Sequence, residues 1–566
     1  MAHASFRPRS TDPDATARLV SDLGLHPVTA QVLVGRGVGD PETARRFLRP
    51  GPADLHDPGR FRDMERAVAC LADAIGAGER IAVYGDYDVD GVCATTVMFR
   101  TLALLGADAR AFIPHRVTHG FGLSGDALRQ LREEGCAVVV TVDNGSTRAE
   151  EIARAQDAGM RLVVTDHHEI GATLPPCPVI NPKRPDTTYP FAGLAGCGVA
   201  FKLAVALAEH MGRTQQSAFR RLLPDLMAAV AVGTVADVVP LCDENRSLVA
   251  LGLQALSATR HAGLRALLEV ARCAGRPVRT HDVAFRIGPR INAAGRLGSA
   301  DLALDLLLCE EADRAKALAS RLDASNRERQ RIERKQAEEA FAQAERGAPD
   351  DPALVLSGVG WHPGVIGIVA ARVAETYDKP AALIAIDGDD ARGSARSFGA
   401  VRLHEALERC SAHLLTHGGH AKAAGFTLSP QSVDPFRAAF LAAVAAQGSA
   451  PEAPREVDAE LPLDAVSMPL IAEIDTLRPF GAGNTEPLFC AFDVHAAGRP
   501  RRTGPGERHL AFHAATDRSS VPAIAFGRAG DEALLEGRFD LAFVLRRRQG
   551  AEPEIHVREI VPVAST

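Results

Sequence analysis

Three short apolar runs, each followed at once by charged or polar residues, constrain the fold of this chain more than any other feature. They occupy residues 80–83, 136–142 and 161–165, with helix-forming segments between them. Strands that are apolar on both faces belong to a sheet covered on both sides, and their alternation with helices favours a parallel, doubly wound sheet. We therefore predict an α/β fold that binds its ligand beside the carboxyl ends of these strands.

The loop after the first run carries three alternating carboxylates, in Gly85-Asp86-Tyr87-Asp88-Val89-Asp90-Gly91. Carboxylates this close repel one another unless a cation lies among them, which predicts a divalent-metal site. The pattern Asp-x-Asp-x-Asp-Gly also begins an EF-hand calcium loop. That loop needs a glutamate at its twelfth position, where this chain has Val97, and a helix before it, where this chain has a β-like run. A solvated acidic turn is the other alternative.

Polar residues follow the other two runs in the same way. Asp143 comes directly after the second run, and the sequence Asp-His-His, which contains His167, comes directly after the third. Parallel strands carry all these ends at one edge of the sheet, so we expect Asp88 and Asp90 to meet Asp143 and His167 there.

Asp237 is the fifth candidate ligand. It lies in an apolar segment that ends at Pro240. A buried aspartate is rare unless it is paired or bound to a metal. A helix cap or an ion pair is an equally good interpretation from local sequence alone.

The bulk composition bounds the class of protein. The chain has 566 residues, enough for about three to five domains. It is 46% apolar, with no run of transmembrane length and no apolar signal core in residues 1–13. Its ten cysteines include no Cys-x-x-Cys pair, which argues against a zinc ribbon or a disulfide framework and suits a cytoplasmic location. With a net charge of −7, a nucleic acid would have to meet local basic patches.

Changes of pattern along the chain divide it into five parts. These are an N-terminal extension laid over the first domain (1–60), the α/β domain with the metal site (61–311), a charged connecting helix (312–347), a second α/β domain (348–450) and a small β-barrel (451–566). The barrel has basic stretches at 499–502 and 546–548, which suit a groove for a single nucleic-acid strand. Ordinary solvated arginines are the alternative.

Four stretches combine small residues with polar ones and suit close approach to phosphate. Residues 286–298 surround Arg290, Asn292 and Arg296 with small residues, and arginine binds phosphate through two parallel hydrogen bonds. Residues 360–367, 392–397 and 417–425 are predicted to be Gly-rich loops with polar tips. Common surface turns explain each stretch equally well by itself.

Taken together, these motifs resemble the DHH phosphoesterase family from about residue 60 to the end. The resemblance is carried, in order, by Gly-Asp-Tyr-Asp-Val-Asp-Gly, Val-Asp-Asn-Gly, Asp-His-His, Val-Ala-Asp-Val-Val-Pro, Arg-Ile-Asn-Ala-Ala-Gly-Arg, Gly-Trp-His-Pro-Gly-Val-Ile-Gly and Gly-Gly-His-Ala-Lys-Ala-Ala-Gly. It implies a DHH domain, a long linking helix, a DHH-associated domain and an OB-fold barrel.

The resemblance also implies roles for single residues. The metal ligands it implies are Asp88, Asp90, Asp143, His167 and Asp237. Asp143 would bridge two ions, and His168 would face the phosphate as the sixth catalytic residue. The residues implied at the 5′-terminal phosphate are Arg116, Arg296, Ser394 and Arg396, with His420 as a further substrate contact. One departure is Tyr84, where some family members have a metal-binding histidine, so one metal site is expected to be weaker.

The activity implied by the resemblance is two-metal hydrolysis of single-stranded DNA from its 5′ end to 5′-mononucleotides, in DNA repair and recombination. Oxygen ligands with one imidazole favour Mn²⁺ or Mg²⁺, and ions bridged by a carboxylate lie about 3.5–4 Å apart. The expected partner is single-stranded DNA, with a single-stranded-DNA-binding protein and a helicase as further candidates. We expect a cytoplasmic monomer with no membrane association.

Two rival functions remain open at this point. One is a phosphodiesterase for very short oligoribonucleotides or cyclic dinucleotides, against which the terminal barrel counts. The other is a non-catalytic scaffold that binds single strands, against which the five retained candidate ligands count. Cleavage of a dinucleotide compared with a long strand would test the first rival, and a metal titration would test the second.

Overall fold

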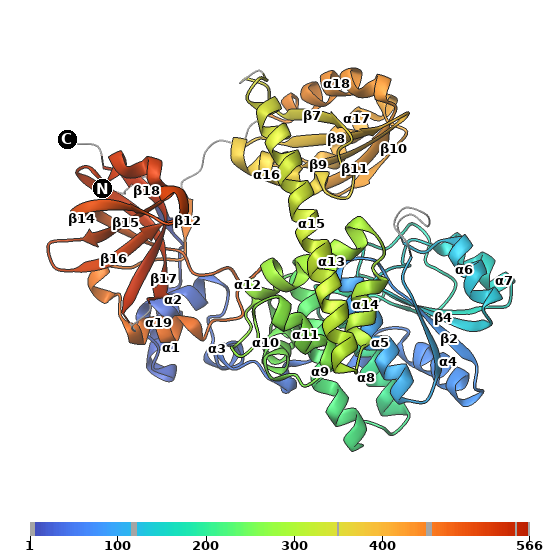
Figure 1. The fold of residues 1–566 in the computed structure, drawn as a ribbon. Coiled ribbons are helices and arrows are strands. Elements are labelled where there is room, and N and C mark those ends of the chain that lie inside the picture. Colours follow the sequence, from blue (N-terminus) through green and yellow to red (C-terminus); the bar gives the residue numbers. More distant parts are fainter. Residues whose placement is uncertain (1–5, 115–121, 348–349, 449–454, 549–551, 564–566) are drawn as a thin grey trace.

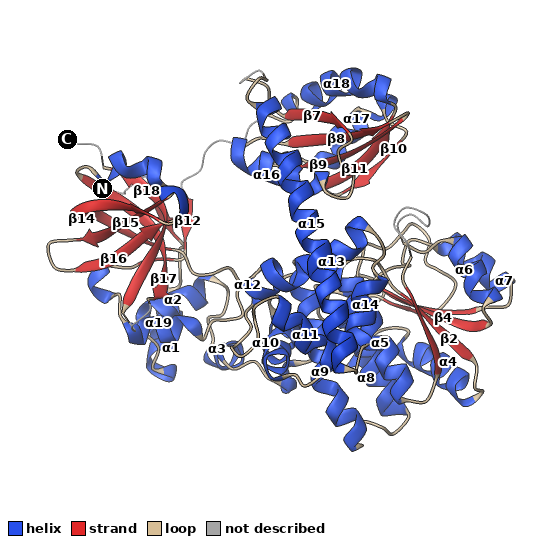
Figure 2. Cartoon of the chain, in the orientation of Figure 1, coloured by secondary structure: helices blue, strands red, loops and turns tan. Residues whose placement is uncertain are grey.

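Two α/β units, a long helix between them and a β-barrel make up the computed structural model (Figure 1). The structure describes residues 6–114, 122–347, 350–448, 455–548 and 552–563. The first α/β unit continues into a group of helices, and the barrel lies beside these helices on the side away from the first sheet (Figure 2).

The first sheet has five strands, all parallel, in the order β3-β2-β4-β5-β6. The three apolar runs form its centre as β2 (Arg80–Tyr84), β4 (Cys136–Val142) and β5 (Arg161–Thr165), with β3 (Asp108–Phe112) and β6 (Val179–Ile180) at the edges. Val138 and Val140 contribute to the core on one face, and Val139 contributes to the core on the other. The predicted parallel sheet with two covered faces is confirmed.

Helices cover both faces of this sheet. On one face lie α4 (Met64–Gly76), α5 (Val89–Leu104) and α8 (Gly196–His210), and on the other α6 (Gly125–Glu133) and α7 (Ala149–Asp157). Ser124 caps α6, because its Oγ accepts a hydrogen bond from the Ala127 amide at 3.2 Å. The acidic loop lies between β2 and α5, so it joins a strand to a helix. An EF-hand loop joins two helices, which excludes that alternative.

A group of helices follows the sheet. They are α9 (Ser217–Ala236), α10 (Asp243–Ala258), α11 (Ala262–Val270), α12 (Thr280–Asp282), the π-helix η3 (Val283–Ile287), α13 (Gly288–Leu297) and α14 (Asp301–Leu308). The charged helix expected over 313–345 is present as α15 (Ala312–Ala344), and it leads to the second α/β unit (Figure 1).

The second sheet has the order β10-β11-β9-β8-β7. Its strands are β7 (Leu354–Val359), β8 (Ala381–Asp387), β9 (Asp390–Arg396), β10 (Thr416–Gly419) and β11 (Ala423–Leu428), with helices α16 (Ile366–Tyr377), α17 (Leu403–Arg409) and α18 (Val433–Ala445). The prediction of loops at 392–397 and 417–425 was wrong, because these residues lie mainly in strands. Gly393 serves packing, because a Cβ there would lie 2.0 Å from the ring of Phe426.

Five strands close into the predicted C-terminal barrel. They are β14 (Phe489–Thr503), β15 (His509–Ala515), β16 (Ser520–Ala525), β18 (Pro553–Pro562) and β17 (Arg538–Arg547), and β17 pairs back to β14. The short strands β12 (Arg455–Val457) and β13 (Ala459–Glu460) and the helix α19 (Met468–Asp475) precede the barrel.

The N-terminal segment packs mainly on the barrel, so the expectation that it lies over the first domain was wrong. It forms β1 (Phe6–Pro8), α1 (Pro13–Leu23), α2 (Pro27–Gly35) and α3 (Pro41–Leu48). Strand β1 pairs with β12, and Leu19 and Leu33 belong to the barrel core. Residues 47–60 of the segment also contact the first unit, where Arg246 Nε donates to the Phe47 carbonyl at 2.8 Å and Lys202 Nζ donates to the His56 carbonyl at 2.7 Å.

Within the described residues, each helix is too short or too polar to cross a bilayer.

Candidate metal centre

The carboxyl ends of β4 and β5 bring the first candidate ligands together. Asp143 directly follows β4 in a left-handed conformation (φ 63°), and its amide donates to the Thr165 carbonyl at 2.9 Å. The turn is fixed from both sides, because Asn144 Nδ2 donates to the Val142 carbonyl and Thr141 Oγ1 donates to the Asn144 carbonyl. This unusual backbone conformation for a non-glycine residue directs the carboxylate over the edge of the sheet.

Two further acidic ligands, Asp88 and Asp90, are set by helix termini. Asp88 is the N-cap of α5, accepting from the Gly91 amide at 3.0 Å. Asp90 lies within the first turn, because α5 begins at Val89. Two amides at the start of α8 hold the Asp90 carboxylate, from Gly196 at 2.6 Å and Cys197 at 3.0 Å.

Two glycines that sequence reasoning missed make room for these carboxylates. A Cβ at Gly196 would lie 2.3 Å from Asp143 Oδ1, and a Cβ at Gly233 would lie 2.6 Å from Asp90 Oδ1. Any side chain would therefore displace the carboxylates. A signal was available in the dense glycine run at 193–198, but the sequence does not show which atoms those glycines approach.

Four of the five predicted ligands meet around His167. Its Nε2 lies 3.2 Å from Asp143 Oδ1, 3.6 Å from Asp237 Oδ2 and 4.0 Å from Asp90 Oδ2. Asp237 reaches this point as the C-cap of α9. Asp88, the fifth, is close enough that its charge raises the carboxyl pKa of Asp143 and Asp237.

The cluster has the properties of a cation site. Three of its buried atoms, Asp143 Oδ1, His167 Nε2 and Asp237 Oδ2, accept no hydrogen bond from any described residue. Burial and the neighbouring Asp90 raise the pKa of Asp143 well above its usual value and that of Asp237 to about 8. Burial also lowers the pKa of His167, which leaves a neutral imidazole able to coordinate. Oxygen donors with one imidazole fit Mn²⁺ or Mg²⁺.

His168 lies beside this cluster but has a partner of its own. Its Nδ1 is 2.7 Å from Asp166 Oδ1. Burial lowers the pKa of His168, but the hydrogen bond and the charge of Asp166 outweigh burial and raise that pKa to about 9. The imidazole is therefore cationic at neutral pH and could face a phosphate.

Asp86, which was not assigned a role from the sequence, belongs to the same electrostatic cluster. Burial and the neighbouring Asp88 raise its pKa to about 7. It was the first carboxylate of the alternating loop, so its position was a usable signal. Tyr84, at the family's histidine position, donates its hydroxyl to the Gly122 carbonyl at 3.1 Å and lies in the core of the sheet.

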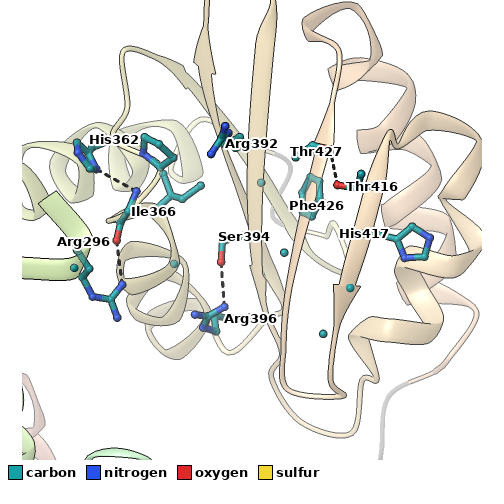
Figure 3. A pocket seen from close by; sticks show the side chains of 18 of the residues that line it. Arg296, His362, Ile366, Arg392, Ser394, Arg396, Thr416, His417, Phe426 and Thr427 are labelled. Carbon is teal, nitrogen blue, oxygen red and sulfur yellow. Dashed lines mark hydrogen bonds between the residues drawn. The ribbon is translucent and has the colours of Figure 1, made fainter. Parts of the chain in front are cut away.

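A cavity of about 880 Å³ lies between the two α/β units, and His168 lines it from the first unit. The four predicted substrate-binding residues that line it are Arg296, Ser394, Arg396 and His420. It is also lined by His362, His417, Thr416 and Thr427, which had no predicted role. Figure 3 shows the labelled members of this lining, among them Arg296, Ser394 and Arg396, around the pocket.

The Arg396 end of this cavity is suited to an anion. Arg396 donates to Ser394 Oγ at 3.1 Å and to the Ala395 carbonyl at 2.8 Å (Figure 3). Burial lowers its pKa, and no carboxylate in the described part of the chain forms an ion pair with it. A Cβ at Gly367, in the first turn of α16, would lie 3.0 Å from the Arg396 guanidinium. A half-buried cation beside a helix N-terminus is a site for phosphate.

Two predicted substrate residues lie outside the cavity, and a third is not among the described residues. Arg290 is paired with Asp323 of α15, at 2.9 Å, and neither it nor Asn292 lines the cavity. Arg116 lies outside the described residues. Arg290 and Asn292 therefore have no support from the geometry as phosphate ligands.

Models of known families match three stretches of the chain. The model of the DHH family N-terminal domain matches residues 80–234, that of the DHHA1 domain residues 350–446, and that of the RecJ OB domain residues 457–552. The matched stretches coincide with the first α/β unit, the second α/β unit and the barrel.

Curated relatives match most of the chain. The single-stranded-DNA-specific exonuclease RecJ of Escherichia coli is 34% identical over 89% of this chain and 88% of its own length. RecJ of Bacillus subtilis is 36% identical over 91% of this chain, and RecJ of Thermus thermophilus is 39% identical over 87%. The chain spans only 65% and 71% of the length of these two relatives.

Solved structures agree with this assignment. A crystal structure of RecJ from Thermus thermophilus in complex with Mn²⁺ has a TM-score of 0.85 and 33% identity, covering 100% of this chain and 81% of that chain. The structure of RecJ from the same organism in complex with Mg²⁺ has a TM-score of 0.79. With its sequence matched over most of its length and all three domain types present, the chain belongs to the RecJ family of DHH proteins.

Proposed function

We propose that the chain is a metal-dependent exonuclease that degrades single-stranded DNA from its 5′ end and releases 5′-mononucleotides. The observation that carries the proposal is the group of three buried, unpartnered atoms on Asp143, His167 and Asp237. The names of the relatives, single-stranded-DNA-specific exonucleases at 34–39% identity, support the substrate.

The proposed cofactors are two Mn²⁺ or Mg²⁺ ions. The residues that would hold them are Asp88, Asp90, Asp143, His167 and Asp237, with Asp143 between the two ions. The ions in the two Thermus RecJ structures support this choice of metals. Bound divalent ions supply Lewis-acid stabilisation of charge on the phosphoryl oxygens and activate water for hydrolysis.

The chain's own residues bind and orient the strand. Arg396 and Ser394, with Arg296 beside them in the same cavity, would hold the 5′-terminal phosphate. His168, held as a cation by Asp166, would offset the charge of a phosphate entering next to the metal cluster. Fixing the terminal phosphate at one end of the cavity would limit cleavage to the first linkages of the strand and so give it 5′ polarity.

The barrel is the proposed platform for the rest of the strand. Of its two basic stretches, the second is partly neutralised, because Arg546 forms an ion pair with Glu486. Arg499 and Arg501 of the first stretch remain exposed. A role in DNA repair and recombination, a cytoplasmic location, the monomeric state, and partnership with a single-stranded-DNA-binding protein and a helicase remain predictions from the family resemblance.

Digestion of end-labelled single strands tests the proposal. With Mn²⁺ or Mg²⁺, a 5′-labelled strand should release labelled mononucleotide at once, whereas a 3′-labelled strand should shorten progressively. Chelation should stop both reactions, and a duplex of the same sequence should resist. Early mononucleotide release from the 3′ label would contradict the polarity.

A dinucleotide tested beside a long strand decides between this activity and the short-oligonucleotide phosphodiesterase. Preferred cleavage of the dinucleotide would favour that rival. Strand binding without cleavage at any metal concentration would favour the non-catalytic scaffold.

A further inference from the structure

The turn that follows Asp237 is strained. Asp237 ends α9, where its amide donates to the Gly233 carbonyl at 2.9 Å. The next residue, Val238, has a φ of 62°, and its side chain is 70% exposed. A β-branched residue in the left-handed region is a genuine outlier, which persists only when the surrounding structure constrains it. The exposed side chain of Val238 provides little such constraint, so the constraint must come from the residues on either side.

The far end of this turn is held by a loop from the C-terminal part of the chain, residues 476–484, between α19 and the barrel. The Leu241 amide donates to the Ala482 carbonyl at 2.7 Å. Two glycines of the loop lie against the turn: a Cβ at Gly481 would be 2.6 Å from Leu241 Cδ1, and one at Gly483 would be 2.9 Å from Pro240 Cβ. The loop therefore packs directly on residues 240–241, three positions beyond the candidate ligand.

Arg246 fixes this loop to the first unit. It is 3% exposed and donates to the carbonyls of Leu477 at 2.9 Å and Arg478 at 2.7 Å, and to that of Phe47 at 2.8 Å. Its guanidinium also lies 3.8 Å from the centre of the Phe47 ring. Within the described ranges, no carboxylate pairs with Arg246, and backbone carbonyls accept its hydrogen bonds instead. These bonds connect α10, which carries Arg246, to the N-terminal segment and to the C-terminal loop. A lysine could keep the charge but could not reach all these acceptors.

From these contacts we infer that the loop 476–484, fixed by Arg246, is a positioning element for Asp237. The C-terminal part of the chain would thus shape the metal centre as well as bind DNA. The inference rests on the proposed metal binding by Asp237, and it concerns how that ligand is held. Asn245 assists from α10, because its Nδ2 donates to the Pro240 carbonyl at 3.0 Å.

Two variants of the full chain test the inference. Gly483→Ala adds a Cβ against Pro240 and strains a residue at φ 69°, and Arg246→Lys loosens the loop. The matched control is Gly537→Ala, which strains a barrel glycine at φ 90° with open space around its Cβ. Hydrogen exchange of a peptide spanning 236–241 in metal-free protein and calorimetric titration with Mn²⁺ are measured for each, with thermal unfolding as the check of folding.

Both test variants should show faster hydrogen exchange over 236–241 and bind Mn²⁺ about 10-fold more weakly than the wild type. Mutations of residues that hold a metal ligand in place typically weaken metal affinity by this amount. Gly537→Ala should match the wild type in both measurements. Unchanged exchange or unchanged affinity in Gly483→Ala would overturn the inference, and this milder variant carries the test if Arg246→Lys does not fold. If the wild-type chain binds Mn²⁺ but does not cleave DNA, the proposed function is overturned and the inference about the loop is not. Hydrogen exchange and calorimetric titration do not depend on cleavage.

Discussion

Asp143 and Asp166 occupy matching places at the ends of β4 and β5, and each is 2% exposed. Asp166 accepts hydrogen bonds from the amides of Ser146 and His167 and from the His168 ring. Burial raises its pKa, but these partners outweigh burial and lower that pKa to about 2. Asp143 has one oxygen without a partner, and burial together with four like charges nearby raises its pKa. Burial is the same at both ends, so the missing partners, rather than burial, mark the place for a cation.

Two arginines, the buried Arg246 and the half-buried Arg396, show the same contrast with the opposite charge. Arg246 is surrounded by backbone carbonyls that use its donors, whereas Arg396 has one hydroxyl, one carbonyl and an open cavity. The first is expected to hold the structure together, and the second to hold a ligand. The following predictions test whether this distinction between satisfied and unsatisfied charges separates structure from function.

The largest effect is expected from Asp143→Asn. Losing a metal ligand should lower the cleavage rate by at least about 10³-fold, because bound metal stabilises the transition state by several kcal/mol. In metal-free protein at high pH, where the Asp143 carboxyl ionises at a cost, the same change removes a buried charge without a partner and should raise the free energy of unfolding by about 1–3 kcal/mol. Cleavage assays and chemical denaturation under chelation measure the two effects. A destabilised metal-free variant would contradict the view that Asp143 lacks a partner.

Arg396→Ala should come next. Loss of charge-assisted hydrogen bonds to the terminal phosphate should lower kcat/KM on 5′-phosphorylated strands by about 10–100-fold. Strands with a 5′-hydroxyl should be affected much less. Arg290→Ala serves as the comparison, because Asp323 holds that guanidinium outside the cavity, and it should leave the ratio between the two substrates at the wild-type value. A changed ratio in Arg290→Ala would restore it as a phosphate ligand.

Asp166→Asn should have a smaller effect on activity, and it should destabilise the folded state where Asp143→Asn stabilises it. It removes a satisfied charge, so the folded state should lose about 1–2 kcal/mol, a value reduced because the His168 ring is 41% exposed. The pKa of His168 should fall toward its ordinary value of about 6.5, so the loss of activity should be greater at pH 8 than at pH 6. An NMR titration of His168 and a pH profile of cleavage would measure this. A parallel loss at both pH values would exclude a role for the His168 charge.

The last prediction leaves the cleavage rate aside and concerns the pH dependence of the free energy of unfolding in metal-free protein. Asp143 and Asp237 have raised pKa values in the folded state, about 8 for Asp237, against about 3.9 in the unfolded chain. The folded state therefore holds more protons between these values. The corresponding stability is fully present below about pH 4 and is lost as the pH rises to about 8, by at most about 1.4 kcal/mol per pH unit for each proton. Denaturation at pH 5 and pH 8 measures this slope, which Asp237→Asn should flatten.

The sequence predicted the sheet and the meeting of the ligands because both depend on local patterns. Strands buried on both faces are apolar along their whole length, as in 136–142, and parallel strands end at the same edge. Asp143 and His167 could therefore be placed together without any knowledge of the loops between them. The cavity residues Ser394 and Arg396 came only from the family resemblance, because their Gly-rich segment was taken for a loop.

What the sequence did not predict depends on contacts between distant segments. Gly196 and Gly233 leave room for carboxylates that lie far away in the sequence. The guanidinium of Arg290 is paired with Asp323, whereas within the described residues no carboxylate pairs with Arg396. Helices α1 and α2 had local signals, each beginning with a proline after a capping residue, Asp12 and His26. Their packing partner could not be inferred, because a helix pattern shows which face is apolar but not what covers it.

Because the N-terminal helices share their core with the barrel, the order of synthesis matters for this chain. A hydrogen bond joins the His26 amide to Glu473, 447 residues later. At ribosomal rates of 5–20 residues per second, α1 and α2 would wait roughly 20 to 90 seconds for the residues that cover them. Their apolar faces would be open to chaperones during that interval, and an mRNA truncated before the barrel would leave them permanently uncovered.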